Sequence, residues 1–178
     1  MAEAPVWHFS EDPGITEFRP HRAPTARDPE PVVWAVEEAR ASDFWFPRDC
    51  PRVLFRAEAG REPSAAGLAL LGGARQVAVV EWGWWARVCG VRLFRYAFAP
   101  GPFRRCANPR WYLTAREAVR PLVVEPVGDV VALHAAAGIE LRLAPNLWPV
   151  AGLVERSGLE FSMIRMRNAL PRPADLEP

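Results

Sequence analysis

The chain has 178 residues, of which 50% are hydrophobic and 11% aromatic, so it can bury a core and is not a disordered protein. All 22 basic residues are arginine, the formal net charge is +1, and the charges are interspersed, so no basic block indicates a nucleic-acid-binding protein. The 3 cysteines have no CxxC or Cys/His spacing, so the sequence indicates neither a zinc site nor a disulfide framework. With no signal-peptide pattern and no run of ~20 apolar residues, a cytoplasmic protein is expected.

The 19 prolines divide the chain into short segments, which favours a sheet-rich fold with short helices. In chain order, β-type patterns predict strands at 5–10, 32–37, 51–58, 76–88, 91–99, 111–126, 139–145 and 159–168. Segments 76–88 and 91–99 could form a hairpin around Cys89 and Gly90. Helical signals predict helices at 38–46, 127–138 and 146–158, with a long loop at 11–31 and a surface turn at 61–67. We therefore expect an α+β fold, one domain over residues 1–170 and a disordered tail at 171–178.

Three separated features carry the candidate chemistry, because the common nucleotide-binding and hydrolase motifs are absent from the sequence. The first is VWHFS, where His8 lies on a predicted strand and Ser10 shares its face by the period of two. The second is PVVWAVEEARASDFWF, in which Trp34 lies on a strand that leads into a short helix. The third is WYLTAREAVRPLVV, which contains Glu117.

In this order, the three features resemble the His, Tyr, Glu signature of the ADP-ribosyltransferase fold. The resemblance spans roughly residues 5–125 and implies a split, sheet-rich ADP-ribosyltransferase-like domain that uses NAD as substrate and needs no metal. His8 would contact the adenosine ribose and the nicotinamide end of NAD, and Ser10 the same ribose. Trp34 would stack on nicotinamide, and Glu117 would stabilise the oxocarbenium-like transition state as nicotinamide leaves. Diphosphate contacts would come from the 11–31 loop, which contains Arg19, His21, Arg22 and Arg27.

The sequence departs from the family pattern at two of these positions. Trp34 stands where a tyrosine is usual, and no Q/E-x-E triplet precedes Glu117, so Glu125 is an equally available carboxylate. The implied activity is transfer of ADP-ribose to an unknown acceptor. The alternative is a non-catalytic α+β binding or scaffold domain. ADP-ribose transfer predicts that His8, Trp34 and Glu117 line one cavity, whereas the binding or scaffold alternative does not.

A second resemblance, to a family of small uncharacterised bacterial proteins, rests on the stretches WHFSED, FWFPRDCPR and FSMIRMRNA. In FWFPRDCPR, Cys50 is either a reactive thiol activated by Arg48 and Arg52 or a buried residue in a rigid turn. The Trp-rich EWGWW (81–85) indicates core packing or a stacking platform. In FSMIRMRN, Arg165 and Arg167 on one strand face indicate an ion pair, for example with Glu140, or an anion site.

Overall fold

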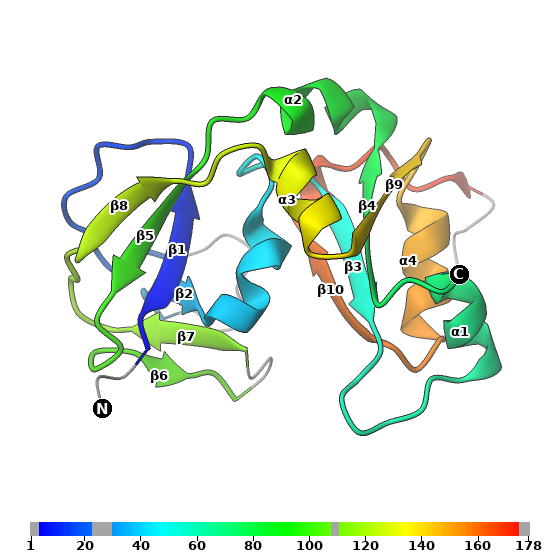
Figure 1. Ribbon diagram of the computed structural model, residues 1–178, viewed down its shortest axis with the longest axis horizontal. Helices are drawn as coiled ribbons and strands as arrows, with labels where there is room; N and C mark the ends of the chain where they lie inside the picture. Colours follow the sequence, from blue (N-terminus) through cyan, green and yellow to red (C-terminus); the bar gives the residue numbers. More distant parts are fainter. Residues whose placement is uncertain (1–3, 23–29, 108–110, 175–178) are drawn as a thin grey trace. The chain divides into compact units, whose positions relative to one another are not determined.

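The structure is a computed structural model that describes residues 4–22, 30–107 and 111–174 (Figure 1). The chain contains both helices and strands, so its class is α+β. It divides into two compact units, each built from two stretches of chain. Unit 1 comprises Met1–Arg48 and Arg92–Gly128, and unit 2 comprises Asp49–Val91 and Asp129–Pro178. All residues that the ADP-ribosyltransferase resemblance singles out lie in unit 1.

Unit 1 is a six-stranded sheet with the strand order β6-β7-β2-β1-β5-β8. Its strands are β1 (Val6–Ser10), β2 (Val33–Val36), β5 (Phe94–Phe98), β6 (Arg104–Arg105), β7 (Tyr112–Ala115) and β8 (Val123–Pro126). Every neighbouring pair is antiparallel. A 3-10 helix, η1 (Glu38–Phe44), follows β2.

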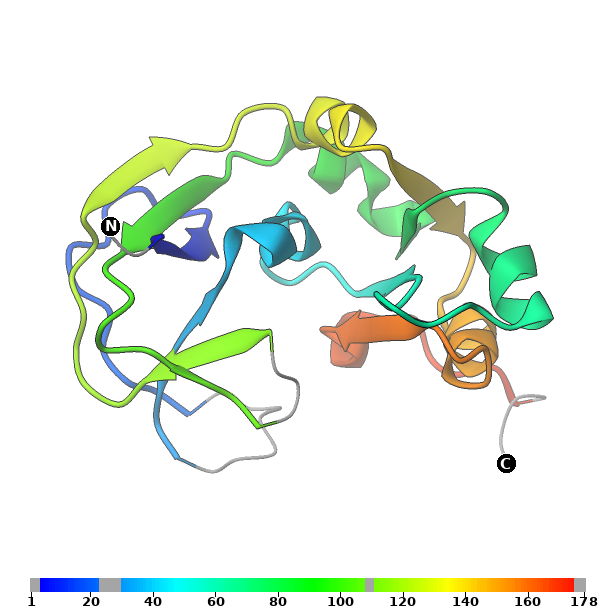
Figure 2. The same ribbon diagram turned by 60° about the horizontal axis from the view of Figure 1, so that its bottom comes forward.

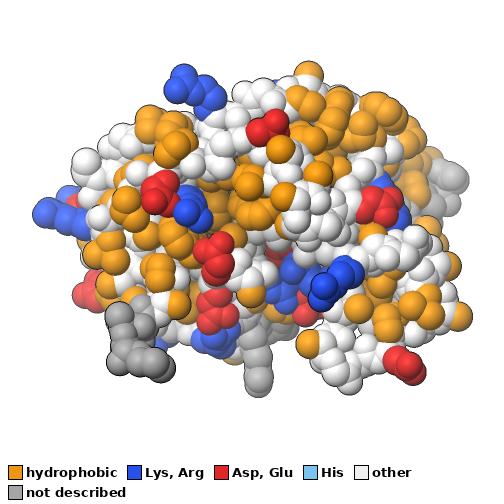
Figure 3. Space-filling model, viewed as in Figure 1, with side chains coloured by type: hydrophobic (Ala, Val, Ile, Leu, Met, Phe, Trp, Pro, Cys, Tyr) orange, Lys and Arg blue, Asp and Glu red, His pale blue; other side chains and the backbone are white. Residues whose placement is uncertain are grey.

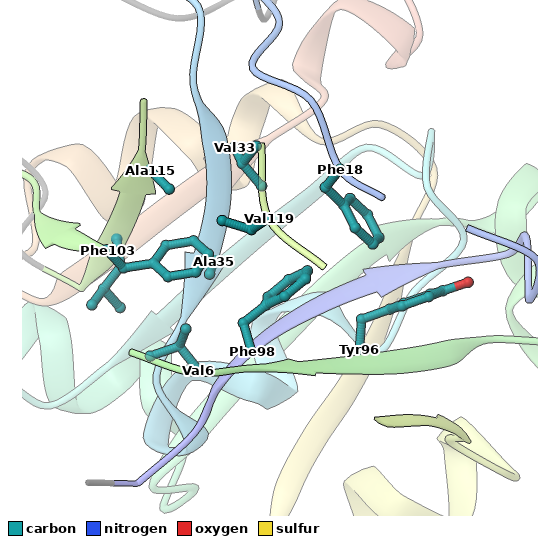
Figure 4. Close-up of a cluster of buried hydrophobic side chains, with 10 residues drawn as sticks. Val6, Phe18, Val33, Ala35, Tyr96, Phe98, Phe103, Ala115 and Val119 are labelled. Atoms are coloured by element: carbon teal, nitrogen blue, oxygen red, sulfur yellow. The ribbon is translucent and has the colours of Figure 1, made fainter. Parts of the chain in front are cut away.

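The two faces of this sheet carry different aromatic groups. One face, the core face, holds a buried cluster drawn in Figure 4: Val6, Phe18, Val33, Ala35, Tyr96, Phe98, Phe103, Leu113, Ala115 and Val119. The opposite face, here the Trp7 face, holds Trp7, Val36 and Ala97, with Phe9, Phe44 and Tyr112 packed beside them. Since successive residues of a strand point to opposite faces, the register of β1 and β2 decides which side chains can meet.

The outer strand β8 pairs with β5 through alternate residues. Val127 N donates to the carbonyl of Leu93 at 2.8 Å, and the register pairs Arg95 with Glu125. Glu125 therefore bonds toward β5, and Leu122 N donates to the carbonyl of Ala97 at 2.8 Å, whereas Val124 and Pro126 point their backbone groups outward. The side chains around β8 are apolar and exposed: Leu122 is 68% exposed and Val123 is 44% exposed. Figure 3 shows hydrophobic groups at the surface over this strand.

Unit 2 is a four-stranded sheet with the order β10-β3-β4-β9, in which only β4 and β9 are parallel. Its strands are β3 (Arg52–Arg56), β4 (Gln76–Glu81), β9 (Ile139–Ala144) and β10 (Glu160–Ile164). Its helices are α1 (Ala65–Leu71), η2 (Trp82–Trp84), α2 (Trp85–Gly90), α3 (Val130–Ala136), α4 (Trp148–Glu155) and η3 (Met166–Asn168).

Helices α1 and α4 lie on one side of this sheet in both views (Figures 1 and 2). Their buried side chains pack on alternate residues of β3 and β4 in a cluster that contains Val53, Phe55, Leu71, Val77, Val79, Leu147, Ala151, Val154 and Leu159. The carboxylate of Glu81, 3% exposed, accepts hydrogen bonds from the backbone N–H groups of Leu147 and Leu170. It thereby ties the start of α4 and the C-terminal segment to the end of β4.

Most strands lie where the sequence predicts them, but the predicted hairpin of 76–88 and 91–99 is wrong. Strand β4 ends at Glu81, and the Trp-rich segment continues as η2 and α2. Moreover, β4 and β5 belong to different sheets. Trp82 is 60% exposed, so it does not pack in a core. Segment 111–126 forms two separate strands, β7 and β8, and the predicted turn at 61–67 contains the start of α1.

The last predicted strand also ends early. It stops at Ile164, because Arg165 adopts a left-handed conformation with φ of 57° and η3 follows. The prediction that Arg165 and Arg167 share a strand face is therefore wrong, and Glu140 pairs instead with Arg142 at 2.7 Å. In the expected tail, Pro171 accepts a hydrogen bond from Asn146, and residues 175–178 lie outside the described part. In the described part of the chain, no helix has the length and apolar character needed to cross a membrane.

Candidate functional site

His8 lies in the middle of β1 with its imidazole half-buried on the core face. Its Nδ1 lies 2.8 Å from the carbonyl oxygen of Trp34, and since a carbonyl only accepts, Nδ1 donates and carries the ring proton. Burial lowers the pKa of His8 to about 4, outweighing the upward effect of this hydrogen bond. At neutral pH the ring is therefore uncharged and held in one tautomer. Its Nε2 is an acceptor that has no hydrogen-bond partner within the described ranges.

Trp34 presents its side chain to the other face of the sheet. Trp7 pairs with Val36 across β1 and β2, so Trp34 lies on the Trp7 face and His8 does not. In agreement, the Trp34 ring meets the ring of Tyr112 edge-on, with 5.5 Å between centroids. Only the backbone carbonyl of Trp34 reaches His8. The structure therefore does not bring His8, Trp34 and Glu117 together around one cavity.

Ser10 shares the core face with His8, as the period of two predicts, but it is 3% exposed. Its hydroxyl accepts a hydrogen bond from the backbone N–H of Asp12. Beside it, Tyr96 lies directly across from His8 on β5 and donates its hydroxyl proton to the carbonyl of Asp12 at 2.5 Å. These bonds fix the start of the loop that follows β1.

The two candidate carboxylates lie in different surroundings. Glu117 is exposed between β7 and β8 and makes no hydrogen bond or ion pair with a residue that the structure describes. Glu125 accepts from Arg95 at 2.7 Å, and the Arg95 guanidinium covers the Trp7 ring at 4.5 Å. Glu125 is therefore on the Trp7 face and already paired. Neither carboxylate contacts His8.

The loop after β1 pairs with the segment before β8 through one isolated antiparallel bridge, the Phe18–Val119 bridge. Phe18 and Val119 exchange backbone hydrogen bonds of 2.8 and 2.9 Å, and both side chains enter the core cluster. The Phe18 ring meets the His8 ring with 4.9 Å between centroids, so the Phe18–Val119 bridge covers His8. Residues next to Phe18 and Val119 in the chain point away from the core, because side chains alternate in extended chain.

On the outer side of the Phe18–Val119 bridge is an open hollow of about 340 Å³, lined by Thr16, Glu17, Arg19 and Arg120. The two oxygens of the Glu17 carboxylate are shared, one 2.7 Å from Arg19 and the other 3.3 Å from Arg120. The Arg120 hydrogen bond and the Arg19 charge lower the pKa of Glu17. Arg19, expected to contact diphosphate, is thus exposed on the side of the Phe18–Val119 bridge away from His8. Arg22 is exposed as well, whereas Arg27 lies outside the described residues.

The comparisons with known proteins give one result. Residues 7–169 match a family of unknown function, DUF6886. The chain belongs to this family. No curated protein matches it, and no solved structure does. The DUF6886 match covers parts of both units, so it contains His8 in unit 1 and the whole FWFPRDCPR stretch (44–52), which begins in unit 1 and continues into unit 2 at Asp49.

In that stretch of this DUF6886 chain, Cys50 is fully buried, and Arg52 donates to its backbone carbonyl at 2.9 Å. Burial raises the pKa of the Cys50 thiol to about 11 in spite of the nearby Arg52 and Arg87 charges. A thiol with such a pKa is protonated at neutral pH and a poor nucleophile. The structure therefore supports the buried-turn alternative for Cys50. Within the described residues, no group of three or more His, Cys, Asp or Glu side chains could hold a metal ion.

Sequence reasoning missed two features of this DUF6886 chain. Arg120 and Glu17 are 103 positions apart and meet only through the Phe18–Val119 pairing, which no local pattern reveals. Tyr96 was predicted only as a strand residue, yet its hydroxyl holds the loop beside His8. The sequence contains one weak signal for this role, namely a tyrosine on a predicted strand close to the strand of His8.

Proposed function

We propose that this protein binds NAD or a related nucleotide-type small molecule, with His8 as a ligand contact. The observation that carries the proposal is the state of the imidazole. Its Nδ1–H is fixed by the Trp34 carbonyl, and its pKa near 4 keeps Nε2 unprotonated at neutral pH. A fixed, uncharged Nε2 acceptor suits a ribose hydroxyl, which can donate one hydrogen bond. The proposal concerns binding, because no carboxylate in the described part of the chain touches His8.

Thermal shift and titration calorimetry with NAD, ADP-ribose and nicotinamide test this proposal. A ligand at a hundredfold over its dissociation constant should stabilise the protein by about 2.7 kcal/mol. In His8→Asn, the amide N–H can still donate to the Trp34 carbonyl, but the Nε2 acceptor is gone. The variant should fold and lose most of the NAD-induced stabilisation. An unchanged response in His8→Asn, or none in the wild type, would contradict the proposal and favour a non-catalytic scaffold.

Transfer of ADP-ribose from NAD, in the manner of ADP-ribosyltransferases, is the second candidate function. The Phe18–Val119 bridge favours it, because it brings the segment of Glu117 alongside the segment that covers His8; Trp34, which lies on the opposite face, would take no part. Glu117 is exposed, so its carboxylate is accessible to a bound ligand. The test is nicotinamide release from NAD by wild type, Glu117→Gln and Glu125→Gln. Transfer through Glu117 predicts release that Glu117→Gln abolishes and Glu125→Gln preserves.

A further inference from the structure

The Glu17 hollow, defined by Thr16, Glu17, Arg19 and Arg120, lies on the surface of unit 1 away from His8. Its volume of about 340 Å³ falls at the lower end of the range of small-molecule sites. Two guanidinium groups face one carboxylate there, so the three charged groups sum to +1. This excess of positive charge favours the binding of an anion.

The carboxylate also orients the two arginines. Glu17 is 25% exposed, and each of its oxygens holds one guanidinium, although the arginine side chains themselves are 81% and 80% exposed. Each guanidinium has five N–H donors and uses few of them on Glu17. Neither the Arg19 nor the Arg120 guanidinium has another hydrogen-bond or ion-pair partner in the described ranges. The remaining N–H groups of both guanidiniums are therefore available to a ligand, one set on each side of the Glu17 carboxylate.

From this arrangement we infer that the Glu17 hollow is an anion site for a small phosphate-bearing molecule. Phosphate oxygens accept paired N–H donors from arginine, and the Thr16 hydroxyl adds one more group that can donate. The Glu17 carboxylate competes with the anion for the same donors. An exposed Arg–Glu pair contributes little to stability, so an incoming dianion can displace it.

This site is independent of the proposed contact at His8. Phe18 and Val119 face the core and cover His8, whereas Glu17 and Arg120 occupy the outer side of the Phe18–Val119 bridge. One ligand group cannot reach both sides. Variants therefore distinguish the two sites: changes in the hollow should leave the His8-dependent NAD response intact, and His8→Asn should leave the anion site intact.

The experiment is calorimetric titration of the full chain with inorganic phosphate, pyrophosphate and ADP-ribose at low ionic strength. The Nε–Hε signals of Arg19 and Arg120 are followed in parallel by nuclear magnetic resonance. Arg19→Ala and Arg120→Ala should each weaken pyrophosphate binding by roughly fivefold to tenfold, the loss of one exposed charged contact. Glu17→Gln should strengthen it, because the competing charge is removed. Arg116→Ala is the matched control, since Arg116 is 77% exposed and paired with Glu30 in the same way.

Three results would overturn the inference. The first is the absence of any phosphate or pyrophosphate binding to the wild type. The second is equal weakening in Arg116→Ala and Arg120→Ala, which would indicate a general charge effect. The third is weaker binding in Glu17→Gln, because removing the competing negative charge must strengthen the binding of an anion at this site. Tighter binding of ADP-ribose than of pyrophosphate would support a nucleotide ligand, and the reverse would support an inorganic or simple phosphate ester.

Discussion

Lowering the pH from 7 to 4.5 adds a proton to His8 far more readily in the unfolded chain than in the folded one. The ordinary pKa of the group is 6.5, and burial in the folded protein lowers it to about 4. Between these two values the unfolded state binds more protons, so the free energy of unfolding falls as the pH falls. The stabilisation is complete above pH 6.5 and is lost progressively as the pH approaches 4.

The magnitude follows from the size of the shift. Each pKa unit corresponds to 1.36 kcal/mol, so the whole shift amounts to about 3 kcal/mol, of which about 2.5 kcal/mol falls between pH 7 and pH 4.5. Urea unfolding at both pH values measures it, with His8→Asn as the comparison, because asparagine does not titrate. Other titrating groups affect both proteins alike. Wild type should therefore lose about 2.5 kcal/mol more than the variant.

If wild type and His8→Asn lose the same stability to within about 0.5 kcal/mol, the reasoning fails. Such a result would mean that the imidazole is protonated as easily in the folded protein as in the unfolded chain. The uncharged Nε2 acceptor at neutral pH, and with it the basis for the proposed ribose contact, would then need another explanation.

Three further predictions concern other buried groups. Native protein treated with a thiol reagent should be modified at the exposed Cys89 and not at Cys50, as mass spectrometry will show; modification of Cys50 without denaturant would contradict its burial. Glu81→Gln should lower the free energy of unfolding by about 2 kcal/mol, because a buried carboxylate that accepts backbone N–H groups is weakened as an acceptor, whereas the exposed Glu155→Gln should change it by less than about 0.5 kcal/mol. Tyr96→Phe should cost about 1 kcal/mol and speed amide exchange in the loop after β1, since the lost hydroxyl holds that loop; unchanged exchange would show that other contacts suffice.

The local patterns of the sequence predicted the strands well where β-branched residues alternate. They placed His8 and Ser10 on one face, and the structure agrees. The sequence could not place Trp34 relative to His8, because that depends on the pairing of Trp7 with Val36 across an intervening loop. A slip of one residue in that register would have moved Trp34 to the face of His8.

Helix α1 shows a different reason for failure. The segment AAGLALL follows a proline and contains Gly67, which together indicate a turn. Its helical signals were present, however, since Ser64 caps the first turn by accepting from Gly67 N, and Gly72 ends the helix with φ of 59°. A Cβ at Gly67 would lie 3.1 Å from the carbonyl oxygen of Ser157, so the glycine serves close packing and not a turn.

The alternation of backbone groups along β8 limits the addition of further strands at this edge of the unit 1 sheet. A strand from another molecule that approached this edge would meet one outward N–H, at Val124, and none at Pro126, which has no amide proton. Continuous pairing is therefore interrupted within two residues. The chain can keep Leu122 and Val123 exposed at this border without offering a template for intermolecular β-structure.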